Sequence, residues 1–265
     1  MKRIKICILI AVLLVTSLAC GLSKSVTETS QDTKTEESPG GFFSDIGKTD
    51  VNSEPVSLNK GLSTLNTYKM TIEVELIGPT QQDVTREKIV QEHSEPQDAS
   101  IISIESYSMT AEDPDPDTGI SNIWRIGNER CTGSDDPDDT EYELMEPDAK
   151  EMADLVLDLF DMNFLIENPQ FIGQESINGV QTNHFNFQLS GLGVESGATV
   201  LANQGDYWLA VDGNYMVRYS LLVQTSSSPD KINHLKVYAN LENVNTPITI
   251  SMPQQCYDAQ YNDED

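Results

Sequence analysis

The amino-acid sequence predicts an α+β domain built on an antiparallel sheet. From residue 67 onward, apolar and polar residues alternate along segments of strand length, and such alternation is typical of strands with one buried face. Short turn signals link these segments, so consecutive strands are expected to pair as hairpins. One long segment, residues 147–161, has the period of a helix instead. A half-buried sheet needs a cover on its apolar face, and helices are the natural cover.

Four strands are expected before the long helix. Leu58, Leu62 and Leu65 are at helical spacing and predict a short helix ahead of the first strand. In that first strand, apolar side chains alternate mostly with Thr, Glu and Lys, as in a half-buried strand. The expected strands are Thr67–Ile77, Thr85–His93, Ala99–Met109 and Ile120–Ile126.

The strands after the long helix are marked by two hairpin signals. Asn178-Gly179 and Asp212-Gly213 each predict a two-residue type I′ turn, because both residues of such a turn need a positive φ. The segment 198–202 is compatible with a short helix. The expected strands are Phe171–Ile177, Val180–Leu189, Tyr207–Val211, Tyr215–Val223 and Ile232–Leu241, with Ile248–Met252 closing the sheet.

Residues 147–161 form the clearest predicted helix. Pro147 suits its first turn, and Asp148 complements the helix dipole there. Apolar side chains fill an arc of about 200° around this helix, whereas covering one sheet face needs roughly 100°. We therefore expect the helix to be contacted on two sides, by the sheet and by a second apolar group.

The first twenty residues have the organisation of a bacterial signal segment. Three basic residues among the first five precede an apolar run, residues 6–15, which is too short to span a bilayer as a helix. Residues 16–21 then resemble a lipobox, in which small residues precede a cysteine that receives a diacylglyceryl group, here Cys20. Acyl chains on Cys20 would anchor the mature chain stably. The alternative is an ordinary signal peptide with a cysteine in this position by chance.

The sequence divides into four parts. Residues 1–19 are the expected signal peptide, and residues 20–54 are the acylated cysteine with a polar tether rich in Ser, Thr, Glu, Asp and Gly. Residues 55–257 form the α+β domain, and residues 258–265 an acidic tail. We therefore expect the protein in the bacterial cell envelope, lipid-anchored on the extracytoplasmic face of a membrane.

The chain is strongly acidic, with 43 acidic residues against 16 basic ones and a formal net charge of −27. Such a charge repels phosphate backbones, so we expect no nucleic-acid partner. It also argues against docking on anionic lipid through basic patches. The motifs of serine hydrolases, zinc proteases, P-loop proteins and dinucleotide-binding proteins are missing from the sequence. We therefore expect no enzymatic activity and no cofactor.

The four cysteines separate into two kinds. Cys7 leaves with the signal peptide and Cys20 is acylated, so Cys131 and Cys256 remain as thiols. Outside the cytoplasm these two are expected to form a disulfide. The alternative, in a reducing niche, is a pair of buried thiols.

An acidic loop is the candidate for calcium. Asp113, Asp115 and Asp117 occupy alternate positions, as at the start of a calcium loop, but the turn glycine is one place late and Trp124 stands where the last ligand is needed. We interpret this segment as a solvated hairpin loop and expect no metal site. Weak calcium binding together with the acidic residues 135–139 is the alternative.

Aromatic and histidine side chains are also assigned by pattern. Trp124, Tyr207 and Trp208 could stack on a ligand, but such residues more often pack in a core or at a barrel rim, which is the interpretation we adopt. His184 alternates with polar residues on a strand and is expected on the solvent side.

Several segments together resemble a known family. Leu65–Tyr68, Ile177–Gly179, Asn183–Phe185, Tyr207–Gly213 and Tyr215–Tyr219 follow one another in an order similar to that of the LolA/LolB and LppX/LprG type of lipoprotein carrier. The resemblance covers about residues 55–253 and rests on the order of elements and on the Asp-Gly hairpin that follows a Trp. It implies a strongly curved, half-open antiparallel barrel with helices covering its concave face. The long acidic insertions depart from the family pattern.

The resemblance also explains why the apolar arc of the long helix is wider than contact with one sheet face requires. In this family, acyl chains lie between sheet and helices, so one flank of the helix would face the sheet and the other a cavity. The expected cavity residues are Met152, Leu155, Val156 and Leu159. The implied function is a monomeric, membrane-anchored lipoprotein that binds or transfers a lipid or another hydrophobic ligand. The alternative is a non-catalytic envelope interaction or scaffold protein that has the same fold with a filled core.

Overall fold

The computed structural model describes residues 61–79, 82–134, 142–144, 166–189, 199–228 and 231–262. The chain forms two compact units, Met1–Glu54 and Pro55–Asp265, and all described residues belong to the second. Cys20 and the predicted helix 147–161 lie outside the described residues. The same is true of the expected cavity residues Met152, Leu155, Val156 and Leu159.

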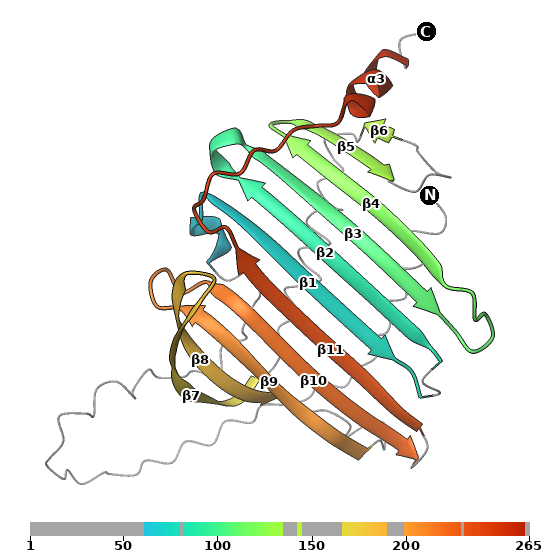
Figure 1. Cartoon of the computed structure of the whole chain (residues 1–265), viewed down its shortest axis with the longest axis vertical. Coiled ribbons are helices and arrows are strands. Elements are labelled where there is room, and N and C mark those ends of the chain that lie inside the picture. Colours follow the sequence, from blue (N-terminus) through green and yellow to red (C-terminus); the bar gives the residue numbers. More distant parts are fainter. Residues whose placement is uncertain are drawn as a thin grey trace, which may run out of the picture. The chain divides into compact units, whose positions relative to one another are not determined.

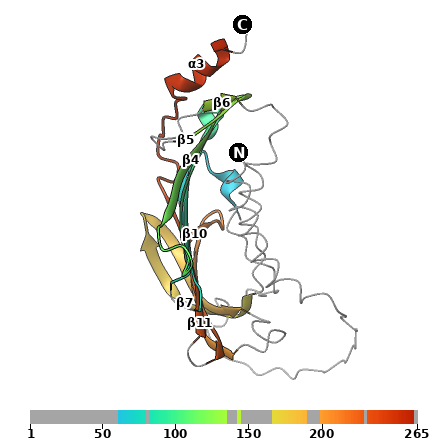
Figure 2. The ribbon, with the colours of Figure 1, turned by 90° about the vertical axis from the view of Figure 1, so that its right-hand side faces the viewer.

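The described strands form one antiparallel sheet of eleven strands (Figure 1). Their order across the sheet is β6-β5-β4-β3-β2-β1-β11-β10-β9-β8-β7, so β6 and β7 are its two edges and the sheet is not closed. Seen from the side, the strands form a single bent layer (Figure 2). The bounds are β1 Thr67–Ile77, β2 Val84–Ser94, β3 Ala99–Met109, β4 Asp117–Ile126, β5 Glu129–Ser134, β6 Tyr142–Leu144, β7 Ile166–Ile177, β8 Val180–Leu189, β9 Thr199–Ala210, β10 Met216–Ser228 and β11 Lys231–Glu242.

The described helices are short. Two are single 3₁₀ turns, η1 (Leu62–Thr64) and η2 (Glu95–Gln97), and the third is α3 (Gln254–Asn262). No helix in the described ranges is long and apolar enough to cross a membrane. Leu62 and Leu65 belong to the main buried cluster, whereas the expected helical cover of the sheet is not seen among the described residues.

The two faces of the sheet differ in character. We call the face that carries the main buried cluster the inner face, and β1 contributes Met70 and Ile72 to it. The opposite, outer face carries charged residues of the same strand, such as Lys69 and Glu73. The alternation expected for this strand is therefore confirmed. A second, smaller cluster lies on the outer face and consists of Trp124, Cys131, Met252 and Cys256, with Ile101, Ile126 and Tyr142 packed against it.

One of the two predicted hairpin turns is confirmed and the other is longer than predicted. Asn178 and Gly179 have φ angles of 52° and 83°, as a type I′ turn requires. In the second hairpin the positive φ angles fall on Gly213 and Asn214 instead of Asp212 and Gly213, and the loop extends to Tyr215. The side chain of Tyr215 is buried, and a loop of this length places it inside.

Two other expectations about secondary structure were wrong. Residues 199–202 belong to β9 instead of a helix, because pairing with β10 overrides the local preference. Residues 248–252 are not a strand. The backbone of Ile250 bonds to the side chain of Gln97 at 3.0 Å instead of to another strand. Strand β5 and helix α3 were not expected, and α3 continues to Asn262 through most of the predicted acidic tail.

Candidate functional site on the inner face of the sheet

A continuous row of apolar and aromatic side chains runs across eight strands of the inner face. Each member is paired in register with the next, so the row crosses the sheet at right angles to the strands. Its centre is fully buried, with Ile72 1% and Tyr219 0% exposed, whereas Phe171 at the β7 edge is 51% exposed. From β3 to β7 this apolar row consists of Ile104, Ile89, Ile72, Ala239, Tyr219, Tyr207, Phe185 and Phe171.

The part of the row on β7 to β10 belongs to an aromatic cluster. The rings of Phe185 and Tyr207 stack with centroids 5.0 Å apart, and Phe187 lies 5.5 Å from Tyr219. Burial raises the pKa of Tyr207 to about 12, so its hydroxyl stays protonated and neutral. The cluster thus presents rigid apolar surface without charge.

Gly205 allows this cluster to close. It lies opposite Phe187 in the neighbouring strand, and a Cβ on Gly205 would fall 2.3 Å from the Phe187 ring. No side chain fits at such a separation without moving the ring. The glycine is therefore required by packing, because the aromatic ring covers the backbone of β9 there.

The inner face becomes more polar toward β2. Glu87 pairs with Val74 on this face, beside the apolar row. Burial raises the pKa of the Glu87 carboxyl, so the neutral form is favoured there. The inner face therefore has an apolar half on β1 and β8–β11 and a mixed half on β2–β5.

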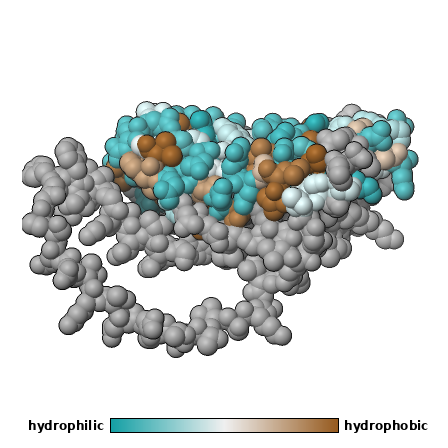
Figure 3. Space-filling view, turned by 90° about the horizontal axis from the view of Figure 1, so that it is seen from below, coloured by the Kyte–Doolittle hydropathy of each residue, from teal (hydrophilic) through white to brown (hydrophobic). Residues whose placement is uncertain are grey.

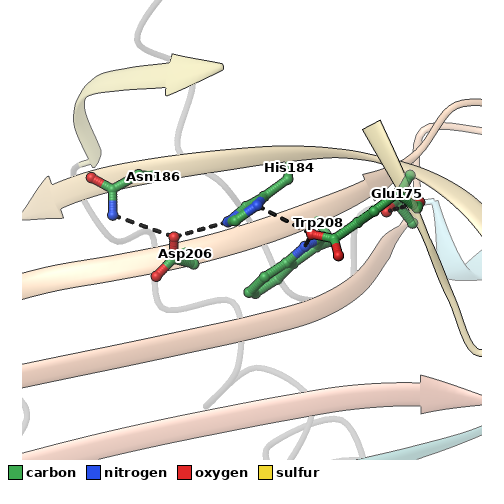
Figure 4. A network of polar contacts seen from close by, with 6 residues as sticks. Glu175, His184, Asn186, Asp206 and Trp208 are labelled. Carbon is green, nitrogen blue, oxygen red and sulfur yellow. Dashed lines mark hydrogen bonds and ion pairs between the residues drawn. The ribbon is translucent and has the colours of Figure 1, made fainter. Parts of the chain in front are cut away.

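The outer face of β7 to β9 carries a polar network around His184 (Figure 4). The two ring nitrogens of His184 lie 3.2 Å from Glu175 and 2.9 Å from Asp206. Its ring stacks on Trp208 at 4.3 Å, and the Trp208 indole N–H donates to Glu175 at 2.7 Å. Asn186 donates to Asp206. The network ties three neighbouring strands together.

These positions test the sequence interpretation of four residues. His184 lies on the outer face, as expected, but two carboxylates hold it. Trp124 and Tyr207 are buried, which confirms their assignment to core packing. Trp208 is half-buried: it packs against the main buried cluster, and its ring also stacks on His184 on the outer face. Position in the strand alternation could have shown this, since Trp208 follows the buried Tyr207 directly.

An open groove of about 950 Å³ lies on the outer face of β1–β4 and β11. Tyr107, Tyr238 and Ile120 line it together with charged side chains, most of which are already paired. Glu75, for example, contacts Arg86 at 2.8 Å and Lys236 at 2.6 Å. The groove is therefore a solvent-facing surface of ion pairs, unlike the apolar cavity that the sequence predicts.

Figure 3 shows that apolar patches interrupt the hydrophilic surface of the described residues.

Two predicted sites remain, the disulfide and the acidic loop that was the candidate for calcium. Cys131 and Cys256 form a disulfide, as predicted, and both are fully buried. Asp113 and Asp115 lie exposed in the turn between β3 and β4, and Asp117 begins β4. Within the described residues, no three His, Cys, Asp or Glu side chains lie close enough together to hold a metal ion.

Comparisons with solved structures return several proteins to which the chain is distantly similar. The chain is similar to the lipoprotein LppX of Mycobacterium tuberculosis, with 13% identity over 72% of this chain and 92% of that one, and a TM-score of 0.32. It is also similar to the LolA-superfamily protein NE2245 of Nitrosomonas europaea, with 9% identity over 78% and 99% of the two chains and a TM-score of 0.22. A hypothetical protein of Chlamydia trachomatis, CT021, matches at 7% identity over 75% and 98%, with a TM-score of 0.28.

Sequence comparisons add nothing to these structural likenesses. No protein-family model matches the chain, and no curated protein matches it. Because the TM-scores lie well below 0.5, the likenesses carry no weight for ligand or activity.

Proposed function

We propose that the chain is a membrane-anchored extracytoplasmic lipoprotein that binds a lipid or another hydrophobic ligand between the inner face of its sheet and a covering helix. The apolar row is the observation that carries this proposal. It is one uninterrupted line of apolar side chains across eight strands, largely buried at its centre, and burying apolar surface contributes roughly 25 cal/mol per Å². A carrier of this kind needs no catalytic group, metal or cofactor.

The order of the strands supports a covering segment. Strands β6 and β7 are consecutive in the sequence but lie at opposite edges of the sheet, and only residues 145–165 connect them. Ten strand spacings separate these edges, which is about 48 Å measured along the sheet. We propose that this connection crosses the inner face and that its predicted helix, residues 147–161, is the second wall of the site. Met152, Leu155, Val156 and Leu159 would then face the ligand.

Affinity for fatty acids is expected to rise with chain length until the site is full. Each buried methylene contributes about 0.8 kcal/mol, which is about a fourfold gain in affinity. Residues 21–265 would be titrated with fatty acids of increasing length against a bound fluorescent fatty acid. Affinity that does not change with chain length would argue against an apolar site.

The covering helix is tested by filling the site. Leu155→Trp should weaken fatty-acid binding and leave the melting temperature unchanged or higher, because the ring occupies ligand space. Asp154→Trp, on the polar arc of the same helix, is the matched control and should bind as the wild type does. If Leu155→Trp unfolds the domain and no fatty acid binds the wild type, Leu155 is ordinary core. The scaffold function would then replace the carrier.

Acylation of Cys20 is tested separately. Radiolabelled palmitate fed to expressing bacteria should label the wild-type protein, and Cys20→Ala should lose both the label and membrane association, because no other signal in the proposal anchors the chain. Cys131→Ser is the control and should keep the label. Equal labelling of wild type and Cys20→Ala would refute the lipobox assignment.

A further inference from the structure

One end of the inner face carries a strip of polar residues on β2 to β5. Three cross-strand pairs define it, because Arg130 is opposite Arg125, Arg125 is opposite Ser100, and Ser100 is opposite His93. Gln91 lies two residues from His93 on the same strand and therefore on the same face. We call these five residues the polar strip.

Two atoms of the polar strip are buried and have no hydrogen-bond partner among the residues that the structure describes. They are Nη1 of Arg130, which is a donor, and Oε1 of Gln91, which is an acceptor. The Gln91 side chain belongs to a residue only 6% exposed. Leaving a buried polar atom unpaired costs stability, so such atoms are uncommon unless another molecule satisfies them.

The charges of the polar strip are also unbalanced at Arg130. Arg125 forms an ion pair with Asp98 at 2.6 Å and donates to the Gly127 carbonyl. No ion pair of Arg130 is found in the part of the chain that the structure describes. Like charges directly opposite each other in a sheet repel. A guanidinium with no ion pair among the described residues, beside another arginine, is unexpected in a chain with a net charge of −27.

His93 continues the polar strip toward the apolar part of the face. Its ring stacks on Tyr68 at 5.1 Å, and Tyr68 belongs to the main buried cluster. Burial lowers the pKa of His93, and the charge of Arg125 lowers it further, whereas Glu95 at 3.6 Å raises it. The positive charge of Arg125 is thus felt by His93 on β2.

We propose that the polar strip binds the anionic head of an amphiphilic ligand, with Arg130 as its principal contact. This inference rests on the proposed function and names its ligand class: an amphiphile with a carboxylate or phosphate head. A guanidinium can bind either group through two parallel hydrogen bonds. Ile102 and Ile123 lie beside the polar strip on β3 and β4. The apolar tail of the ligand would therefore run from its anionic head over these two side chains toward the apolar row.

Matched ligands test the charge of the head in the wild-type protein. Oleate and oleyl alcohol have the same chain, but only oleate is anionic at neutral pH. Oleate should bind at least about tenfold more tightly, since hydrogen bonds to a charged group are the stronger ones. Inorganic phosphate alone should bind far more weakly than oleate, because it has no tail.

Variants then assign the effect to Arg130. Arg130→Gln should remove most of the preference for oleate and leave the affinity for oleyl alcohol unchanged, and Arg130→Lys should retain part of it. Arg86→Gln is the matched control, because Arg86 lies on the outer face in a pair with Glu75. If a variant does not fold, the comparison of the two ligands in the wild type still decides.

The outcomes separate this inference from the proposed function. If oleate and oleyl alcohol bind the wild type equally, the head site is wrong and the hydrophobic carrier stands. If neither binds, the proposed function itself fails. If phosphate binds in an Arg130-dependent way and no lipid does, the polar strip is a site for small anions. The proposal of an amphiphilic ligand is then overturned.

Discussion

Loss of the Cys131–Cys256 disulfide is expected to lower the free energy of unfolding by about 3–5 kcal/mol. The bond joins residues 125 positions apart, so it removes much of the freedom of the unfolded chain. It also holds α3 against β5 in a small cluster with Trp124 and Met252. Urea denaturation of Cys131→Ser/Cys256→Ser, compared with the oxidised wild type, measures the difference.

Two controls separate this effect from others. The wild type in reducing agent should approach the stability of the double variant, because both lack the bond. In a Trp208→Phe background, the fluorescence of the buried Trp124 reports on the cluster itself. A loss below about 1 kcal/mol would show that the cluster holds the C-terminal segment without the bond.

Gly205→Ala is expected to destabilise the domain by about 1–3 kcal/mol. The added methyl group would meet the Phe187 ring, which is 1% exposed and packed against Tyr207 and Tyr219. The ring cannot move without displacing these neighbours, so the strain spreads through the aromatic cluster. Thermal or urea unfolding measures the loss.

A matched glycine and a compensating change complete this test. A Cβ on Gly173, in β7, would meet nothing within 4 Å, so Gly173→Ala should change stability by less than about 0.5 kcal/mol. Phe187→Leu should make room for the methyl group, so the double variant Gly205→Ala/Phe187→Leu should lose less than the two single losses combined. Equal effects of Gly205→Ala and Gly173→Ala would contradict the packing role of Gly205.

The strands that alternate clearly could be predicted from sequence. The predicted bounds of Thr67–Ile77, Ala99–Met109 and Val180–Leu189 agree with β1, β3 and β8. In these segments one face is buried and the other is exposed, so the local pattern carries the information. The disulfide could also be predicted, because only one pairing was left once Cys7 and Cys20 were assigned.

Features that depend on distant partners could not be predicted in this way. Strand β5 is short and carries polar residues on both sides, and its burial depends on α3, whose residues are more than a hundred positions away. The start of β5 does have a local signal in the sequence. Gly127 and Asn128 form the two-residue turn between β4 and β5, and this turn sets Arg125 opposite Arg130. The helix 147–161 and the Cys20 lipobox stay predictions, because they lie outside the described residues.

The middle of the sheet has a consequence for when the domain can fold. Strand β1 pairs with β11 through residues 69–77 and 234–242. The half of the sheet formed by β1–β6 can therefore join the half formed by β7–β11 only when residues 234–242 are present. Until then β1 exposes a bare edge, and contacts this far apart in sequence form slowly. In this chain, the topology itself delays completion of the sheet until residues 234–242 are available to pair with β1.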